Sequence, residues 1–379
     1  MNIPKLRFKD NNGNDYPQWE KKLIKDILKI YHGKDYKNEP NEKKLYPVLG
    51  TGGIITYIDK FLCDWECVLI GRKGTINKPQ YMKTPFWSVD TLFYSKPKLK
   101  QNPKFQYYLF QNINWKIYDE STGVPSLSAS TIEHINRFIP TYAEQEKIAS
   151  FFSTIDKKIK NLANTITSLE NQKKGLLQQI FSQKLRFKDK NGNNYPNWKK
   201  KKLGDIGDII TGKTPETNKI EYWNGNILFV TPTDIKDNKY QLITQRYVNE
   251  CIKIRILPIN TIMFTCIGAT IGKIAISKKR CITNQQINSI IPQKDIYNEY
   301  IYYNLLKLVP KIRSSKSTTT LPIINKTEFS KIKIDIPCLE EQTKIADFLS
   351  AFDRKLDNQK AQLEHWQQIK KGLLQQMFV

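Results

Sequence analysis

Two long stretches of the chain carry apolar residues that recur in alternating steps of three and four. They start near Ile148 and Ile345, and each predicts a helix of about 40 residues, or about 60 Å at 1.5 Å per residue. This spacing is typical of the a/d seam of a coiled coil. The predicted seam residues are Ile155, Ile159, Leu162, Ile166, Leu169, Phe352, Leu356, Leu363 and Trp366. Lys173 and Lys370 interrupt the two seams at equivalent positions, where a polar residue can fix the register of pairing.

The apolar spacing leaves the partner of each helix open. Two ordinary core helices, or a seam for association between molecules, have the same spacing. Because one chain holds two matching seams separated by a domain, we favour pairing within the molecule. Antiparallel pairing would place the preceding domains at opposite ends of a helical spacer, although the spacing itself is compatible with either direction. Pro140 and Pro337 stand just before the helices, where proline is tolerated.

The regions outside the helices read as mixed α/β. Short β-rich runs, such as residues 67–70 and 227–230, alternate with clusters of Gly, Asn, Lys and Thr. We therefore expect an α/β fold of the mixed α+β kind with two domains joined by a long antiparallel two-helix coiled coil. The expected boundaries are a first domain at 1–141, a helical region at 142–183, a second domain at 184–338 and a second helical region at 339–379.

The chain repeats itself. Residues 6–19 recur as 185–198 with eleven of fourteen positions identical, at an offset of 179. Residues 139–151 recur as 336–348 at an offset of 197, and Gly-Leu-Leu-Gln-Gln recurs near the end of each helix. The difference between the offsets places 18 extra residues in the second variable region. Repeated blocks around unlike middles predict a shared frame with internal pseudo-twofold symmetry that presents two different surfaces.

The charge balance points to a polyanionic partner. The chain has 61 Lys and Arg against 36 Asp and Glu, a net charge of +25. Nucleic acid is the leading partner for such an excess, and an inert basic surface is the alternative. No membrane-length apolar run or signal peptide is found, so we expect a cytoplasmic protein with no membrane partner. The six cysteines and three histidines lack the spacing of a zinc site or a catalytic triad, so no metal ligand and no catalytic residue is predicted.

Polar loops in both variable regions have the composition of DNA contacts. Amide side chains can pair bidentately with adenine edges, and cations can bind phosphates; solvated turns are the alternative. The predicted DNA-binding residues of the first region are Arg72, Lys73, Thr75, Lys78, Ser121 and Thr122. Those of the second region are Lys213, Thr214, Thr231, Thr233, Lys273, Lys279, Arg280, Asn284, Gln285, Arg313, Ser315 and Thr318.

Two strings look like enzyme motifs but lack the required context. Residues 207–214 fit the P-loop pattern, yet four lysines lie upstream in place of a hydrophobic strand, and Pro215 follows in place of a clear helix. Residues 102–105 resemble the Asn-Pro-Pro-aromatic motif of adenine methyltransferases, but Lys104 replaces the second proline. We therefore predict neither ATP binding nor intrinsic methyl transfer. An enzyme using these motifs is one rival, and a structural coiled-coil protein with incidental charge is another.

The order of repeated blocks resembles the specificity subunit of bacterial type I restriction-modification enzymes. The signals are Ile-Pro at 139–140 and 336–337, each leading through Lys-Ile-Ala into a helix that carries Gly-Leu-Leu-Gln-Gln near its end. Tyr-Pro-x-Trp opens each domain at 16–19 and 195–198. Residues 211–215, 222–223 and 230–234 resemble the start of the family's target-recognition domains, which accounts for the P-loop-like string. The resemblance covers essentially the whole chain.

The resemblance implies a division of labour. Each target-recognition domain would read one half of a bipartite, asymmetric site in the major groove of double-stranded DNA. The paired helices would set the unread spacer and dock two methylation subunits, which use S-adenosylmethionine to methylate adenine. Restriction subunits, using ATP and Mg, would add translocation and cleavage. This chain itself would be non-catalytic and would bind no cofactor.

Overall fold

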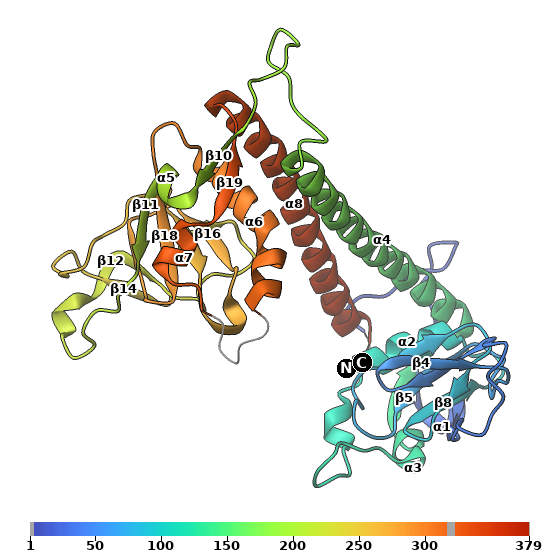
Figure 1. Cartoon of the computed structure of the whole chain (residues 1–379). Coiled ribbons are helices and arrows are strands. Elements are labelled where there is room, and N and C mark those ends of the chain that lie inside the picture. The colour runs from blue at the N-terminus through green and yellow to red at the C-terminus, as the bar shows by residue number, and fades with distance from the viewer. Residues whose placement is uncertain (1–3, 317–322, 379) are drawn as a thin grey trace. The chain divides into compact units, whose positions relative to one another are not determined.

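The computed structural model describes residues 4–316 and 323–378. Its internal contacts divide the chain into two compact units, with Met1–Asn164 and Gln359–Val379 in unit 1 and Thr165–Asn358 in unit 2. Both dividing points fall inside long helices, so each unit contains one α/β region and part of each helix (Figure 1). The mixed α/β class is as predicted, and the domain boundaries remain a prediction.

Unit 1 contains three small sheets with strand orders β1-β9, β2-β8-β5-β6 and β4-β3-β7. The strands are β1 (Glu20–Leu23), β2 (Leu28–Tyr31), β3 (Tyr46–Gly50), β4 (Gly53–Ile58), β5 (Cys67–Gly71), β6 (Gln80–Met82), β7 (Trp87–Ser88), β8 (Leu92–Pro97) and β9 (Asn136–Ile139). The helices are α1 (Ile24–Ile27), α2 (Pro103–Asn112), the 3-10 turn η1 (Trp115–Tyr118), α3 (Ala129–Glu133) and α4 (Tyr142–Phe181), which continues into unit 2. The apolar run of β5 is buried along its whole length, as expected of a central strand.

Unit 2 repeats this order of elements, with strand orders β10-β19, β11-β18-β15-β16-β13 and β14-β12-β17. The strands are β10 (Lys199–Lys202), β11 (Gly207–Thr211), β12 (Trp223–Val230), β13 (Tyr240–Gln241), β14 (Arg246–Val248), β15 (Ile262–Thr265), β16 (Ile274–Ser277), β17 (Cys281–Thr283), β18 (Ile287–Pro292) and β19 (Lys333–Ile336). The helices are α5 (Leu203–Ile206), the 3-10 turns η2 (Ile220–Tyr222) and η3 (Gly268–Thr270), α6 (Asn298–Lys316), α7 (Lys326–Ser330) and α8 (Leu339–Met377), whose second half lies in unit 1.

The largest difference in loop length follows the second strand of the three-stranded sheets. Residues 51–52 join β3 to β4, whereas residues 231–245 join β12 to β14. The longer loop includes β13, which pairs in parallel with β16 and adds a fifth strand to the main sheet of unit 2. It lies within the second variable region, where the offsets of the repeats placed the extra residues.

A buried carboxylate holds each repeated peptide, residues 6–19 and 185–198, against one of the long helices. Glu341 has no exposed side-chain surface and accepts hydrogen bonds from Arg186 Nε at 3.1 Å, Arg186 Nη2 at 2.8 Å and Trp198 Nε1 at 2.9 Å. These bonds raise the pKa of Arg186 above its ordinary value. In unit 1, Glu144 is equally buried and binds Arg7 and Trp19 at 2.7–3.0 Å. The repeated Arg, Trp and Glu are therefore one structural element.

The long helices are joined by one ion pair within each unit. In unit 1, Lys370 of α8 pairs with Asp156 of α4 at 2.6 Å. In unit 2, Lys173 of α4 pairs with Asp353 of α8. The lysines that interrupt the predicted seams thus bind carboxylates across the helix pair. Of the predicted seam residues, Ile155, Leu162, Ile166, Leu169 and Leu356 are buried, and Ile159, Phe352, Leu363 and Trp366 are partly buried.

Candidate nucleic-acid interface

Several predicted DNA-binding residues of unit 2 meet where β12 and β17 end. These strands are parallel, with Val230 opposite Thr283, so their C-terminal ends share one edge. Thr231 and Asn284 follow directly, and the Asn284 backbone N donates to Val230 O at 3.1 Å. Thr231 Oγ1 donates to Asp234 Oδ2 at 2.6 Å and lies 2.8 Å from Thr233 Oγ1, so the threonine loop is internally braced.

The loop after β11 reaches the same edge. Gly212 approaches so closely that a Cβ there would lie 2.2 Å from Asn284 O and 2.3 Å from Thr283 O. Only glycine fits this position without a shift of the backbone. Beyond it, Lys213 is exposed, and Thr214 Oγ1 donates to Gln285 Oε1 at 2.8 Å.

The side chains of two further predicted cations donate hydrogen bonds to backbone carbonyls at this edge. Lys273 Nζ donates to Pro232 O at 3.0 Å, which joins the β15–β16 loop to the threonine loop. Arg313 Nε, from α6, donates to Ile271 O of the same loop at 2.7 Å. We call residues 212–214, 231–233, 267–273 and 284–286 the polar edge of unit 2.

The remaining predicted residues of unit 2 are not part of the polar edge. Lys279 and Arg280 precede β17 and therefore lie at the opposite end of that strand. Arg280 is also paired with Glu250 at 2.5 Å. The side chain of Ser315, and Thr318 as a whole, lie outside the described residues.

Unit 1 brings its predicted residues together in the same way. Lys73 forms a bridge with Ser126, and Gly74 N donates to Pro125 O at 2.8 Å. The loop with Arg72, Lys73, Thr75 and Lys78 is thus joined to the loop with Ser121 and Thr122, where Ser121 Oγ donates to Asp119 Oδ1 at 2.8 Å. Two further segments adjoin these loops, since Arg72 N donates to Thr91 O at 2.7 Å and Lys34 N donates to Ser88 O at 2.8 Å. We call residues 33–35, 72–78, 89–91 and 121–125 the polar edge of unit 1.

The sequence reasoning missed the first-unit counterpart of Gly212 and Lys213. Gly33 is packed so tightly that a Cβ there would lie 1.9 Å from Val89 O, and Lys34 beside it is exposed. The signal was available, because the offset of 179 that relates the N-terminal repeats carries Gly33 and Lys34 onto Gly212 and Lys213.

Both enzyme-like strings have structural roles. Residues 207–211 of the P-loop-like string form β11, which pairs antiparallel with β18 from Gly207 to Thr211. An extended strand cannot wrap its amides around a phosphate as a P-loop does. In the methyltransferase-like string, Asn102 caps α2 by accepting a hydrogen bond from Phe105 N at 2.9 Å, with Pro103 in the first turn.

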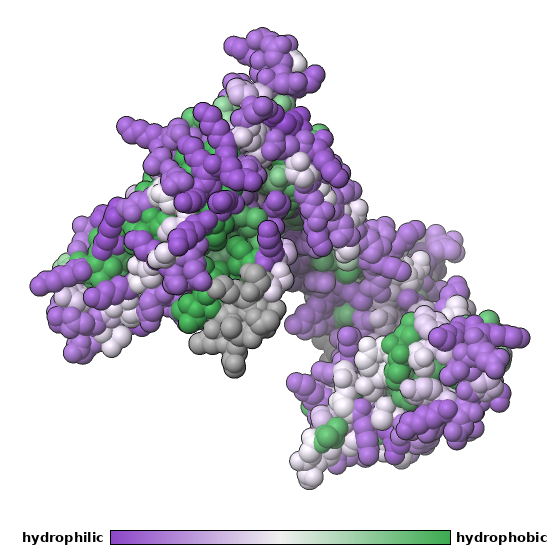
Figure 2. All heavy atoms as spheres, viewed as in Figure 1, coloured by the Kyte–Doolittle hydropathy of each residue, from purple (hydrophilic) through white to green (hydrophobic). Residues whose placement is uncertain are grey.

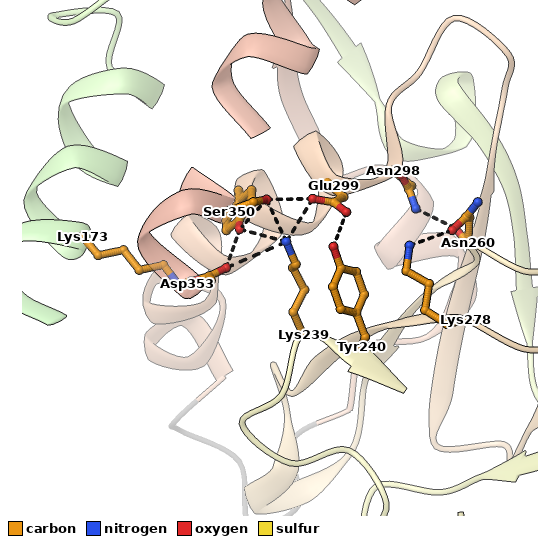
Figure 3. A network of polar contacts seen from close by, with 10 residues as sticks. Lys173, Lys239, Tyr240, Asn260, Lys278, Asn298, Glu299, Ser350 and Asp353 are labelled. Atoms are coloured by element: carbon orange, nitrogen blue, oxygen red, sulfur yellow. Dashed lines mark hydrogen bonds and ion pairs between the residues drawn. The ribbon is translucent and has the colours of Figure 1, made fainter. Parts of the chain in front are cut away.

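A buried polar network attaches the inserted loop of unit 2 to α6 and α8 (Figure 3). Lys239 Nζ contacts Glu299 Oε2 at 2.9 Å and Ser350 Oγ at 2.8 Å, and lies 4.0 Å from Asp353 Oδ2. Tyr240 donates to the other oxygen of Glu299. The loop that begins at the polar edge is therefore attached to α6 and α8 through Lys239 and Tyr240.

Replacing Lys239 by methionine should lower the free energy of unfolding by about 3–5 kcal/mol, because Glu299 would keep a buried charge without its cation. Burial alone would raise the pKa of Glu299, but hydrogen bonds from Tyr240, Lys239 and Ser350 lower it below 4.5. Such a carboxyl stabilises the fold above its unfolded pKa and loses that effect as the pH falls. The deficit of the variant should therefore be full near neutrality and shrink as the pH falls below 4.5.

Urea unfolding at pH 7 and at pH 4 measures this difference. Lys236, exposed on the same loop, provides the matched control, and Lys236→Met should change stability by well under ~1 kcal/mol. Equal stability of Lys239→Met and the parent at pH 7 would contradict the role given to the network.

The visible face of both units is mainly hydrophilic (Figure 2). Within residues 4–316 and 323–378, no helix is long and apolar enough to cross a membrane. The same residues contain no group of three or more His, Cys, Asp or Glu side chains placed to hold a metal ion.

A protein-family model matches the chain in two places. The model of the type I restriction modification DNA specificity domain matches residues 16–171 and 195–365, so it matches once in each half. The chain belongs to this family. The matched ranges include every residue of both polar edges and most of both long helices.

Relatives in the specificity-domain family match this chain over different lengths. The MjaIX specificity subunit of Methanocaldococcus jannaschii is 35% identical over 210 residues, covering 52% of this chain and 48% of that protein. The HindI specificity subunit of Haemophilus influenzae is 33% identical over 175 residues, covering 42% and 37%. The chain thus spans about half or less of these two relatives. The putative MjaX specificity subunit of M. jannaschii is 23% identical over 415 residues, covering 97% and 94%.

Two solved structures share the fold of this chain. The S subunit of a type I restriction-modification system from M. genitalium aligns with a TM-score of 0.68 at 18% identity, covering 100% of this chain and 99% of that chain. A chain from structural work on complex assembly and conformational transition of the type I R-M system aligns with a TM-score of 0.60 at 14% identity, covering 95% and 97%.

Proposed function

We propose that this chain is the non-catalytic DNA-specificity subunit of a type I restriction-modification complex. Each unit would read one half of a bipartite site in double-stranded DNA through its polar edge. The observation that carries the proposal is that the same edge is built twice, with a tightly packed glycine followed by an exposed lysine in each copy, while the neighbouring side chains differ. A common frame with unlike side chains suits two different half-sites.

The helices would set the unread spacer and dock two methylation subunits. The ion pairs at Asp156 and Lys370 and at Lys173 and Asp353 are related by the 197-residue offset of the repeat. This reciprocity supports an antiparallel coiled coil with internal pseudo-twofold symmetry, which would offer two alike surfaces to two alike subunits. Methylation subunits would bring S-adenosylmethionine for adenine methylation, and restriction subunits would use ATP and Mg. The proposed domains remain 1–141 and 184–338, with helical regions 142–183 and 339–379.

Genome-wide mapping of methylated adenines, with and without this gene in the presence of its methylation subunits, tests the proposal. Loss of methylation at one bipartite sequence of fixed spacer is the expected result. Unchanged methylation, or loss at a single contiguous site, would contradict it. Calorimetric titration of the isolated chain separates the enzyme alternative, since tight binding of ATP or S-adenosylmethionine would favour that rival.

DNA binding by the complex should weaken steeply with salt, because each neutralised phosphate releases counterions and adds about −0.9 to the slope of log K against log salt. Replacing Lys34 or Lys213 by alanine should reduce the steepness of that slope by about 1. Lys333, exposed on β19 and outside the polar edge, is the control, and its alanine variant should keep the parental slope. A salt-independent affinity would favour the structural coiled-coil alternative.

A further inference from the structure

The turn from β7 to β8 in unit 1 and the turn from β17 to β18 in unit 2 are the same turn. Three backbone hydrogen bonds of unit 1 have counterparts in unit 2. Leu92 N donates to Val89 O (3.0 Å) as Ile287 N does to Asn284 O (3.2 Å), and Arg72 N donates to Thr91 O (2.7 Å) as Cys266 N does to Gln286 O (2.8 Å). Leu127 N donates to Arg72 O (2.9 Å) as Ile324 N does to Cys266 O (2.9 Å). Residues 89–91 and 284–286 are therefore equivalent one by one.

The surroundings of the two turns match as well. The Cβ position of Gly33 points at the carbonyls of Ser88 and Val89, and that of Gly212 points at the carbonyls of Thr283 and Asn284. Each glycine is followed by an exposed lysine. Asp90 and Gln285, the middle residues of the two turns, thus directly follow the carbonyls that Gly33 and Gly212 approach.

The side chains at this corner differ in chemistry. Unit 1 has Asp90 and unit 2 has Gln285, and both are exposed. Gln285 is oriented by Thr214, whose hydroxyl donates to Oε1 at 2.8 Å. Within the part of the chain that the structure describes, the Asp90 carboxylate has no hydrogen bond or ion pair, although Arg72 Nη1 donates to its backbone carbonyl at 3.4 Å. Two outward-facing groups with different hydrogen-bonding patterns therefore occupy one position of the frame.

The two groups suit different bases. A carboxylate only accepts hydrogen bonds, whereas an amide both donates and accepts. In the major groove, an aspartate accepts from the N4 amine of cytosine, and a glutamine pairs bidentately with N6 and N7 of adenine. A carboxylate at an edge lined with cations is repelled by phosphates, so it fits a base amine better than the DNA backbone.

We propose that Asp90 and Gln285 are equivalent specificity-determining residues. Asp90 selects cytosine at one position of one half-site, and Gln285 selects adenine at the equivalent position of the other. This assignment rests on the proposed function, because it requires each polar edge to face one half-site.

Selection from DNA libraries with randomised half-sites, using the chain in complex with its methylation subunits, tests the assignment. Asp90→Asn gives the corner an adenine-type pattern, so adenine should replace cytosine at one position of one half-site only. Gln285→Glu gives it a carboxylate, so cytosine should replace adenine at one position of the other half-site. Affinity for the original base should fall by about 10- to 100-fold in each case. Alanine at either site should remove the preference at that position alone.

Matched controls lie at the opposite ends of the strands. Asp64 precedes β5 and Gln293 follows β18, and both are exposed, so Asp64→Asn and Gln293→Glu should select the parental sequence. Circular dichroism and complex formation check that each variant folds. Parental selection by both corner variants, or altered selection in both halves by either one, would overturn the assignment. A parent complex that selects no bipartite sequence would instead contradict the proposed function.

Discussion

The free energy of unfolding should fall by about 3–5 kcal/mol when Glu341 is replaced by glutamine, because one partner of a buried ion pair is lost. The glutamate accepts three hydrogen bonds from Arg186 and Trp198 and has no exposed side-chain surface. A glutamine of nearly the same size would present an NH2 group where only donors face it. The penalty would therefore come from an uncompensated guanidinium and an unsatisfied donor, with no cavity formed.

Urea unfolding measures the loss, and hydrogen exchange locates it. The variant should lose protection in residues 185–198, whereas Glu144→Gln should lose it in residues 6–19. Glu340 is the matched control, because it is exposed and accepts one hydrogen bond from Tyr195 at 2.9 Å; its glutamine variant should lose at most about 1 kcal/mol. A Glu341→Gln variant as stable as the Glu340 control would show that the carboxylate does not hold the repeated peptide.

Exchange of residues 203–332 for the corresponding region of another family member should replace one half of the methylated sequence and leave the other half and the spacer unchanged. The joints are set by the frame. Strand β10 pairs with β19 up to Lys202 and Lys333, and Leu203 N donates to Ile332 O at 2.9 Å directly beyond that ladder. The exchange therefore keeps both strands that connect the α/β region of unit 2 to the long helices.

The reciprocal exchange in unit 1 has the same joints. Strand β1 pairs with β9 up to Leu23 and Asn136, and Ile24 N donates to Ile135 O at 2.9 Å. Exchange of residues 24–135 should change only the half-site that the first exchange left intact. Mapping of methylated adenines reads both outcomes. Changes in both halves after a single exchange would contradict independent reading.

The helices and the repeated frame were predictable because their signals are local or repeated. Apolar steps of three and four predicted helices in the regions that α4 and α8 occupy, whereas the pairing of Gly33 with Gly212 was missed although the offset of 179 relates the two residues. Charged interruptions were also informative, since Lys173 and Lys370 stand where ion pairs cross between helices. Periodicity reports which side of a helix is buried, and repetition reports which residues share a role.

Long-range polar pairing was not predictable in the same way. The contact of Lys239 with Glu299 and Ser350 joins residues 60 and 111 positions apart, in a loop with no counterpart in unit 1. Nor did the P-loop-like string reveal itself as a strand, because β11 takes its partner from β18. Among the predicted DNA-binding residues, sequence could not separate Lys279 and Arg280 from the polar edge, since that depends on strand direction.

The order of charges along the long helices favours the antiparallel direction of the proposed coiled coil. Both α4 and α8 carry an aspartate followed by a lysine, at Asp156 and Lys173 in one and at Asp353 and Lys370 in the other. Opposed directions bring each aspartate to a lysine, whereas a shared direction in equivalent register would face like charges against like. Each helix alone is complementary to a reversed copy of itself. The favoured polarity of the pair therefore depends on the charge order of both helices, and exchange of both charges within one helix would favour the opposite polarity.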